Sequence, residues 1–264
     1  RNPFDLNTIR KFASGIVVTG MMYRALVLLC MLGACVANHQ LFIHNNCPQT
    51  VWVGLLGNPS IPDGGGFELR SGQSHTSTVA NNWSGRVWGR THCGGSQCET
   101  GDCGGGKIQC NGAGGIPPAT LAEITFDAGS SHNQDFYDIS LVDGYNLQMS
   151  MAPRQGTFNP GSGHYYCTRA GCNTDLNKIC PSELQVHGTG GVVACMSACM
   201  KFNRDDYCCR GAHATPQTCP PFSYSRTFKQ ACPDAYSYAY DDQSSTFTCN
   251  GHGAGTTAYD IYFC

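Results

Sequence analysis

Five carboxylates are concentrated in the stretch LAEITFDAGSSHNQDFYDISLVDGYN, which contains no lysine or arginine. Charged residues make up only 13% of the chain, so this is a local concentration. Paired carboxylates can hydrolyse a glycosidic bond, because one stays protonated as the acid while the other stays ionised as base or nucleophile. Crowding of like charges raises one pKa and separates the two roles. The candidates are Glu123, Asp127, Asp135, Asp138 and Asp143.

The spacing within FYDISLVDG limits which of these residues can share a site. Asp138 and Asp143 are five positions apart, and an odd spacing places side chains on opposite faces of a strand. They can meet only if the strand ends or bulges before the Asp-Gly pair, which is a strong turn signal. The alternation then predicts that Tyr137, Ile139 and Leu141 fill the interior, with Asp138 on the opposite face. Asp127 and Asp135 flank a polar loop and are expected to be solvated.

Two kinds of segment must position these residues. Residues 39–160 and the C-terminal TAYDIYFC contain short runs rich in β-branched and aromatic residues, such as QLFIHNN, TVWVGLLG and LAEITFDA. Short strands separated by Gly-rich turns predict a β-sandwich or barrel of two packed sheets. Residues 167–248 are rich in cysteine, and SELQV, VACMSACMKF and FSYSRTFKQACP are weakly helical. We therefore expect a partly helical lobe that disulfides stabilise beside the β core.

The first 37 residues have the pattern of a targeting segment. Residues 21–37 have a basic start, an apolar run and a small-residue end, which predicts a secretory signal peptide. Residues 1–20 are interpreted as an upstream segment outside the native product, and residues 38–264 as the secreted, extracellular domain. Two of the 18 cysteines fall in the signal region, which leaves 16. An even number in an oxidising compartment predicts up to eight disulfides.

Composition excludes several classes of partner. The formal net charge is −2 and no basic patch is present, which argues against nucleic acid. After residue 37 no apolar run reaches membrane length, so we expect no stable membrane anchor. The nine histidines show no metal spacing, and the Gly runs lack the lysine of a phosphate loop. The sequence therefore predicts a monomer without a metal or cofactor.

Several motifs, in order along the chain, resemble one known family. CETGDCGGGKIQC, PPATLAEITF, FYDISLVDGYN, DDYCCRGAH and CPDAYSYAYDD are similar to segments of the thaumatin-like proteins, over residues 40–264. The short loop CGGSQC and the intact Asp-Gly resemble the animal members, especially those of insects; the first cysteine pair usually encloses a longer loop. The resemblance implies a pathogenesis-related type of protein. Its fold would be a flattened β-sandwich of about eleven strands, with a disulfide-rich, partly helical lobe and a small loop lobe.

The resemblance also implies a disulfide pairing, which spacing alone does not decide. The first bond would tie the two ends of the secreted chain, which constrains the unfolded chain by about 5 kcal/mol in the entropy model. The implied pairs are Cys47–Cys264, Cys93–Cys98, Cys103–Cys110, Cys167–Cys249, Cys172–Cys232, Cys180–Cys195, Cys199–Cys208 and Cys209–Cys219.

The members of this family share an acidic cleft made by one Arg, one Glu and three Asp. By motif these are Arg86, Glu123, Asp138 and Asp143, with Asp241 preferred to Asp242 as the third Asp. Asp234 is interpreted as structural, and Asp102 as a turn cap or the partner of a nearby Arg. Three aromatic residues beside the acidic positions would stack on sugar rings: Tyr137, Tyr145 and Tyr236.

The resemblance implies a secreted defence protein that binds β-1,3-glucan of fungal cell walls, or a related cell-wall polysaccharide, and acts against fungi. The alternative is an endo-β-1,3-glucanase that uses Glu123 as the acid and Asp138 or Asp143 as base or nucleophile. A third interpretation is a protein-binding or inhibitory module without a sugar role, with the acidic residues in structural ion pairs. The sequon NWS predicts glycosylation at Asn82, four residues before Arg86.

Overall fold

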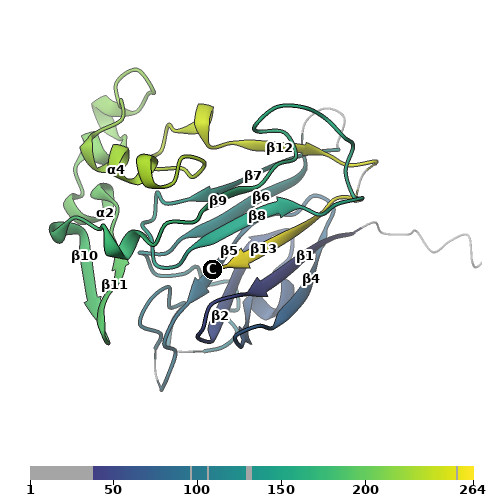
Figure 1. The fold of residues 1–264 in the computed structure, drawn as a ribbon, viewed down its shortest axis with the longest axis horizontal. Coiled ribbons are helices and arrows are strands. Elements are labelled where there is room, and N and C mark those ends of the chain that lie inside the picture. Colours follow the sequence, from purple (N-terminus) through teal and green to yellow (C-terminus); the bar gives the residue numbers. More distant parts are fainter. Residues whose placement is uncertain (1–37, 96, 106, 129–132, 254) are drawn as a thin grey trace, which may run out of the picture. The chain divides into compact units, whose positions relative to one another are not determined.

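The computed structural model describes residues 38–95, 97–105, 107–128, 133–253 and 255–264. The expected upstream segment and signal peptide, residues 1–37, lie outside the described residues. Within the described residues the chain forms thirteen strands, which belong to two large sheets and one hairpin. Figure 1 shows the strands as the main part of the fold, with the few helices gathered beside them.

The first sheet brings the beginning and the end of the described chain together. Its five strands, in spatial order, are β4 (Ser74–Ala80), β1 (Asn38–Asn45), β13 (Ala258–Phe263), β8 (Met149–Pro153) and β9 (Ala170–Cys172). β1 and β13 pair in parallel, with Leu41 opposite Tyr259 and Ile43 opposite Ile261. The disulfide Cys47–Cys264 closes this pairing just beyond the ends of the two strands.

The second sheet carries four of the five carboxylates of the acidic stretch, namely Glu123, Asp127, Asp135 and Asp138. Its six strands, in spatial order, are β12 (Phe247–Asn250), β7 (Gln134–Ser140), β6 (Leu121–Ala128), β5 (Ser84–Arg90), β2 (Val51–Asn58) and β3 (Gly66–Leu69). All neighbouring strands of this sheet pair antiparallel. Antiparallel strands can bury one face and leave the other polar.

One hydrophobic core joins the inner faces of the two sheets. Leu41 and Ile43 of β1 contribute to it from the first sheet, and Ile124 of β6 and Ile139 of β7 contribute from the second. All four side chains are buried, as the alternation of each strand requires. The expected β-sandwich is therefore confirmed, with thirteen strands where about eleven were expected.

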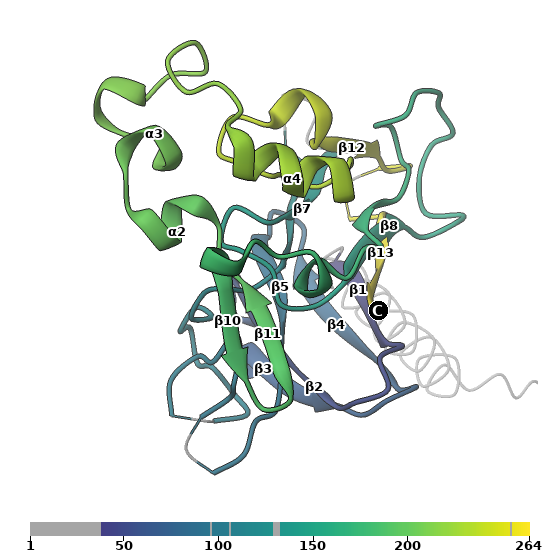
Figure 2. The same ribbon diagram turned by 60° about the vertical axis from the view of Figure 1, so that its left-hand side comes forward.

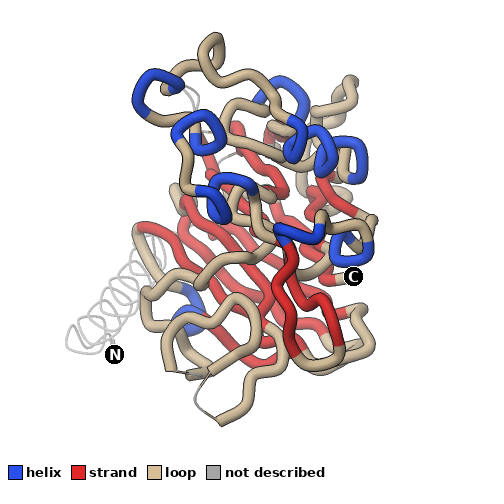
Figure 3. Tube along the Cα trace, turned by 90° about the vertical axis from the view of Figure 1, so that its left-hand side faces the viewer, coloured by secondary structure: helices blue, strands red, loops and turns tan. Residues whose placement is uncertain are grey.

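The three α-helices of the described residues form a lobe beside the sandwich, as Figures 2 and 3 show. The α-helices are α2 (Ala198–Phe202), α3 (Asp205–Cys208) and α4 (Ser223–Ala231). Short 3₁₀ turns are η1 (Pro62–Gly65), η2 (Leu176–Lys178), η3 (Ser182–Leu184), η4 (Gly211–His213) and η5 (Asp242–Ser244). The partly helical lobe is confirmed for the segments that form α2 and α4.

The segment SELQV was expected to be weakly helical, and this expectation is wrong beyond its first turn. After η3 the chain forms a hairpin of β10 (Gln185–Gly188) and β11 (Gly191–Cys195). The β-branched Val186, Val192 and Val193 favour strands, and Gly190 and Gly191 supply the positive φ angles of the turn. This hairpin accounts for two of the additional strands.

The described residues contain eight disulfides, and they join the same cysteine pairs that the resemblance implies. Four of them hold the lobe: Cys172–Cys232, Cys180–Cys195, Cys199–Cys208 and Cys209–Cys219. Such cross-links compensate for the small apolar area that short helices bury.

A buried arginine fixes the small loop lobe. Arg90, at the end of β5, is 0% exposed and its guanidinium donates to four backbone carbonyls, of Trp52, Val53, Lys107 and Ile108. Asp102 accepts from the backbone N–H groups of Cys98 and Gly104, so its expected role as a turn cap is confirmed. Burial lowers the pKa of Arg90, and the charge of Asp102 partly offsets this effect.

Candidate functional site

Three charged residues form a row across the outer face of the second sheet, which we call the charged row. Arg86 of β5 lies directly opposite Glu123 of β6, and Glu123 lies directly opposite Asp138 of β7. Residues paired in this way have Cβ atoms about 4.5–5.5 Å apart. All three line the same hollows on the protein surface. Strand register thus brings together three residues whose outermost members, Arg86 and Asp138, are 52 positions apart in the chain.

Asp143 joins the charged row because β7 ends at Ser140. The following turn contains Gly144 at φ +85°, where an added Cβ would lie 2.6 Å from the Cβ of Pro118. Only glycine fits this turn without strain. The turn places Asp143 Oδ2 3.9 Å from Arg86 Nη1. Asp138 and Asp143 can share a site only if the strand ends or bulges before the Asp-Gly pair, and the strand does end there.

Asp138 is the most strongly perturbed acid of the site. Its Oδ1 is buried and has no hydrogen-bond partner among the described residues. Burial, with smaller contributions from the charges of Glu123 and Asp242, raises the pKa of Asp138 from 3.8 to about 8. The Asp138 carboxyl group is therefore largely protonated at neutral pH and can donate a proton.

Glu123 lies between a cation and a second acid. Burial raises the pKa of Glu123 above 4.5, the charge of Arg86 opposes this rise, and the charge of Asp143 adds to it. Arg86 therefore stabilises the ionised form of Glu123. The pair therefore contains one carboxyl group that burial keeps protonated and one acid that faces a cation.

The wall opposite the turn comes from the segment after α4. The backbone of Tyr236 donates to Ile139 O and accepts from Leu141 N, which fixes this segment along the end of β7. The Tyr236 hydroxyl donates to Asp242 Oδ1 at 3.0 Å, and burial raises the pKa of Tyr236. Tyr236 therefore lies in the cleft as expected. We call the charged row together with Asp143, Tyr236 and Asp242 the acidic cleft.

Asp242, and not the preferred Asp241, is the Asp that contacts Tyr236 and whose charge acts on Asp138. Asp241 is 8% exposed. It accepts from Ser237 N, Ser237 Oγ and Ser244 Oγ, and lies 3.1 Å from Lys229 Nζ. These contacts hold the loop that carries Tyr236 and Asp242. Asp241 is therefore a positioning residue.

Lys229 was missed in the sequence. It lies in the last turn of α4, where it also donates to the carbonyls of Ala235 and Ser244 and to Ser245 Oγ. Its partners are 6 to 16 positions away across a loop, so no local spacing reveals them. Through these contacts the helical lobe fixes one wall of the acidic cleft.

Two tyrosines expected in the cleft lie in the core instead. Tyr137 is 1% exposed and its hydroxyl donates to Thr168 O at 2.5 Å. Alternation along β7 explains this position, because Tyr137 follows an outward residue and precedes Asp138. Tyr145 is also 1% exposed, and its backbone pairs with that of Cys195. Neither ring is available to a sugar in the acidic cleft.

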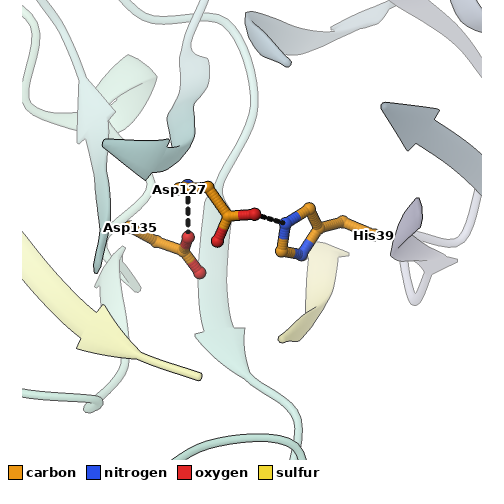
Figure 4. Close-up of side chains that lie close together, drawn as sticks. All are labelled: His39, Asp127 and Asp135. Atoms are coloured by element: carbon orange, nitrogen blue, oxygen red, sulfur yellow. Dashed lines mark hydrogen bonds and ion pairs between the residues drawn. The ribbon is translucent and has the colours of Figure 1, made fainter. Parts of the chain in front are cut away.

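Asp127 and Asp135 were expected to be solvated, but both are buried together with His39. Asp135 is 0% exposed and accepts from Asp127 N, Thr257 Oγ1 and Tyr259 OH. Asp127 Oδ2 accepts from Gly255 N and lies 3.3 Å from His39 Nε2. We call His39, Asp127 and Asp135 the buried acid cluster; Figure 4 shows the three side chains.

The buried acid cluster has the residue types of a metal site. One ligand atom from each residue lies within 4.8 Å of the others. However, both oxygens of Asp135 already accept hydrogen bonds, and the His39 Nδ1 faces the Thr257 carbonyl oxygen at 2.8 Å. The cluster is held by these bonds, and we assign no metal to it. Sequence reasoning missed His39 because its partners are 88 and 218 positions away.

A model of the Thaumatin family matches residues 45–264. The chain belongs to this family. It is 53% identical to Pathogenesis-related protein 5 of Arabidopsis thaliana over 231 residues, which cover 84% of this chain and 88% of that protein. It is 50% identical to the Glucan endo-1,3-beta-glucosidase of Prunus avium over 228 residues, which cover 83% of this chain and 88% of that protein. The thaumatin-like resemblance is confirmed.

These relatives are plant proteins, as is Thaumatin-like protein 1 of Pyrus pyrifolia, which is 50% identical over 229 residues that cover 83% of this chain and 88% of that protein. They give no support to the expected resemblance to animal members.

Among solved structures, the fold is similar to that of a laminaripentaose-producing β-1,3-glucanase in complex with laminaritetraose. The TM-score is 0.52, the identity is 12%, and the match covers 86% of this chain and 98% of the glucanase. At this level of identity the likeness shows the fold alone.

Three further sequence expectations concern residues outside the cleft. Asp234 lies 2.8 Å from His164 Nε2 in an ion pair at the surface, consistent with a structural role. Asn82 is exposed, between the buried Trp83 and the end of β4, so its side chain is accessible to a glycan. Within the described residues, no helix is both long and apolar enough to span a membrane.

Proposed function

We propose that this protein is a secreted defence protein that binds β-1,3-glucan of fungal cell walls in the acidic cleft. The observation that carries the proposal is the charged row, in which a protonated acid, a carboxylate and an arginine lie side by side on a polar face. Such a row presents both donors and acceptors to sugar hydroxyls. A plant pathogenesis-related relative that is 53% identical supports it.

A second candidate function is slow hydrolysis as an endo-β-1,3-glucanase. The specific observation in its favour is the difference between the two paired acids, because glycoside hydrolysis needs one protonated and one ionised carboxyl group. A relative that is 50% identical is named Glucan endo-1,3-beta-glucosidase. In this proposal the expected roles are exchanged: Asp138 is the acid, and Glu123 is the base or nucleophile.

The chemistry follows from these protonation states. Asp138 donates its proton to the glycosidic oxygen as the bond to the anomeric carbon breaks. Glu123 attacks the anomeric carbon, and water later releases the sugar with the proton returning to Asp138. Because Glu123 and Asp138 are direct cross-strand neighbours, we expect the short separation of about 5–5.5 Å that retaining enzymes use.

Two assays test the proposals separately. Retention on insoluble β-1,3-glucan, compared with insoluble β-1,4-glucan, measures binding. Release of reducing ends from laminarin measures hydrolysis. If wild-type protein is retained but releases no reducing ends, the binding proposal stands and the hydrolysis proposal is excluded. Retention that is equal for wild type and Glu123→Gln would contradict the cleft as the binding site.

If neither retention nor release occurs, the polysaccharide proposal fails and a protein-binding or inhibitory role replaces it. An affinity experiment with secreted fungal hydrolases would then test that role. The acidic residues would in that case act as structural ion pairs, although Arg86 and Asp143 lie 3.9 Å apart and are about 40% exposed, so their pair contributes little.

We also propose the processing and state of the chain. Residues 21–37 would be removed as a signal peptide, and residues 38–264 would be secreted as a monomeric thaumatin-like domain. A glycan at Asn82 would lie two residues before Ser84, which borders the cleft. N-terminal sequencing and intact mass of the secreted protein test the cleavage point and the glycan.

A further inference from the structure

We propose that the binding groove continues beyond the charged row along β5, β6 and β7, and that the ring of Phe136 stacks there on a sugar residue. This inference rests on the proposed function and deepens it. It specifies an internal stretch of a β-1,3-glucan chain, instead of a chain end, as the ligand.

Two hollows, each of about 360 Å³, lie on either side of the charged row, and all three residues of the row line both. One hollow extends toward the turn, to Asp143 and Tyr236, and we call it the turn-side hollow. The other extends away from the turn, and we call it the Phe136-side hollow. A chain lying in both hollows would cross the row in its middle.

The alternation of the strands explains why the groove is continuous. On β7 the residues Phe136, Asp138 and Ser140 follow one another at intervals of two and line the hollows in that order. On β6 Glu123 and Thr125 do the same. Residues that are two apart share one face of a strand. From Ser140 to Phe136 the strand covers about 13 Å, which is longer than one pyranose ring.

Phe136 is unusual for an exposed residue. Five large hydrophobic side chains are exposed in the described part of the chain, and Phe136, at 38%, is the one aromatic residue among them. The other four are isoleucines. An aromatic ring that is left open in a polar hollow provides a flat apolar surface, which suits the C–H face of a sugar ring.

Beyond the charged row, three residues that line the Phe136-side hollow are neutral and polar. Ser84 Oγ and Thr125 Oγ1 lie 2.7 Å apart and hold each other in place across β5 and β6. Asn58, at the end of β2, lines the same hollow. Hydroxyl and amide groups around one aromatic ring match the hydroxyl edge and the apolar face of a neutral sugar.

The test is the dependence of affinity on oligosaccharide length. Dissociation constants for laminaribiose through laminarihexaose are measured by calorimetry for wild type, Phe136→Ala and Phe136→Tyr. We expect the affinity of wild type to rise with length. Phe136→Ala weakens hexaose binding about three- to ten-fold, leaves laminaribiose binding unchanged, and is rescued by the tyrosine.

A matched control is Ile179→Ala, because Ile179 is 48% exposed and lines neither hollow. It should bind every oligosaccharide as wild type does. The melting temperature of each variant shows that it is folded. If Phe136→Ala binds hexaose as tightly as wild type, this inference falls and the proposed function stands. If wild type binds no laminari-oligosaccharide, both fall together.

Discussion

Strands β6 and β7 each carry two acidic residues, and the two pairs lie in opposite surroundings. Glu123 and Asp138 are direct neighbours on the outer face, and the buried Oδ1 of Asp138 has no hydrogen-bond partner among the described residues. Asp127 and Asp135 lie at the other end of the same two strands, inside the protein. There Asp135 accepts three hydrogen bonds and Asp127 faces His39.

Burial raises the pKa of Glu123 and Asp138 in one pair and of Asp135 in the other, but the compensation differs. For Asp135, hydrogen bonds from Thr257 and Asp127 and the charge of His39 all oppose the rise. For Asp138, the charges of Glu123 and Asp242 add to it. A buried acid whose oxygens are satisfied stabilises the fold, whereas a buried acid without partners raises the energy of its ionised form and keeps a proton. Hydrogen-bond satisfaction therefore separates the structural pair from the reactive pair.

The largest expected effect concerns the structural pair. Asp135→Ala leaves three buried donors without an acceptor, namely Asp127 N, Thr257 Oγ1 and Tyr259 OH. We expect the free energy of unfolding to fall by about 3–5 kcal/mol. Urea unfolding measures it, with the disulfides intact. Glu123→Ala is the matched control on the outer face, and an equal loss there would remove the distinction between the two pairs.

The second prediction concerns pH. The folded state holds the Asp138 proton up to about pH 8, whereas the ordinary pKa of 3.8 applies in the unfolded chain. The folded state therefore binds more protons in this window, and its stability falls as the pH rises from about 4 to about 8. Asp138→Asn removes this dependence and raises stability at pH 8 by several kcal/mol. It also abolishes hydrolysis, if hydrolysis occurs.

Unfolding curves at several pH values check this prediction. Glu123→Gln should retain the slope between pH 4 and 8 that Asp138→Asn loses. If wild type and Asp138→Asn show the same slope over this interval, Asp138 ionises in the fold and the proposed protonated acid would have to be abandoned.

The third prediction separates the adjacent residues Asp241 and Asp242. Asp241→Asn weakens the contact with Lys229 and is expected to cost about 1–3 kcal/mol. Asp242→Asn changes stability by less than about 0.5 kcal/mol, because Asp242 is exposed. However, it removes a charge near Asp138 and should lower the pKa of Asp138. Equal effects of the two substitutions on stability would contradict the positioning role of Asp241.

The smallest expected effect on stability is that of Arg86→Gln, because its pair with Asp143 is long and partly exposed; about 0.5 kcal/mol or less is expected. Its effect on chemistry is larger, since loss of the cation raises the pKa of Glu123. When glucan retention or hydrolysis is plotted against pH, the decrease on the acidic side (the acid limb) should move to higher pH. Arg86→Lys keeps the charge and should leave that limb unchanged, and a shift of the same size in both variants would contradict the electrostatic role.

The members of the charged row could be predicted because several motifs locate them and because strand alternation and the Asp-Gly turn act locally. Tyr137 could have been placed correctly by the same alternation, which already assigned it to the interior beside Asp138. Proximity to an acidic residue along the chain is a poor guide in a strand, because neighbours point to opposite faces. Tyr145, beyond the strand, was placed in the core by its pairing with Cys195.

The rest depends on long-range contacts that no spacing reveals. The burial of Asp127 and Asp135 depends on His39 and Thr257, at the starts of β1 and β13, and these strands meet only in the folded sheet. The choice between Asp241 and Asp242 depends on Lys229, which reaches the loop from α4. In both cases the partner of a carboxylate decides its role, and that partner comes from another element.

The pKa of the Asp138 carboxyl group tests the distinction between the two pairs most directly. The side-chain carboxyl carbon can be followed by NMR during a pH titration, and Asp138→Asn assigns its signal. We expect a transition near pH 8, with the Asp138 carboxyl protonated at neutral pH. A transition near pH 4, where an ordinary Asp titrates, would contradict a protonated acid in the acidic cleft.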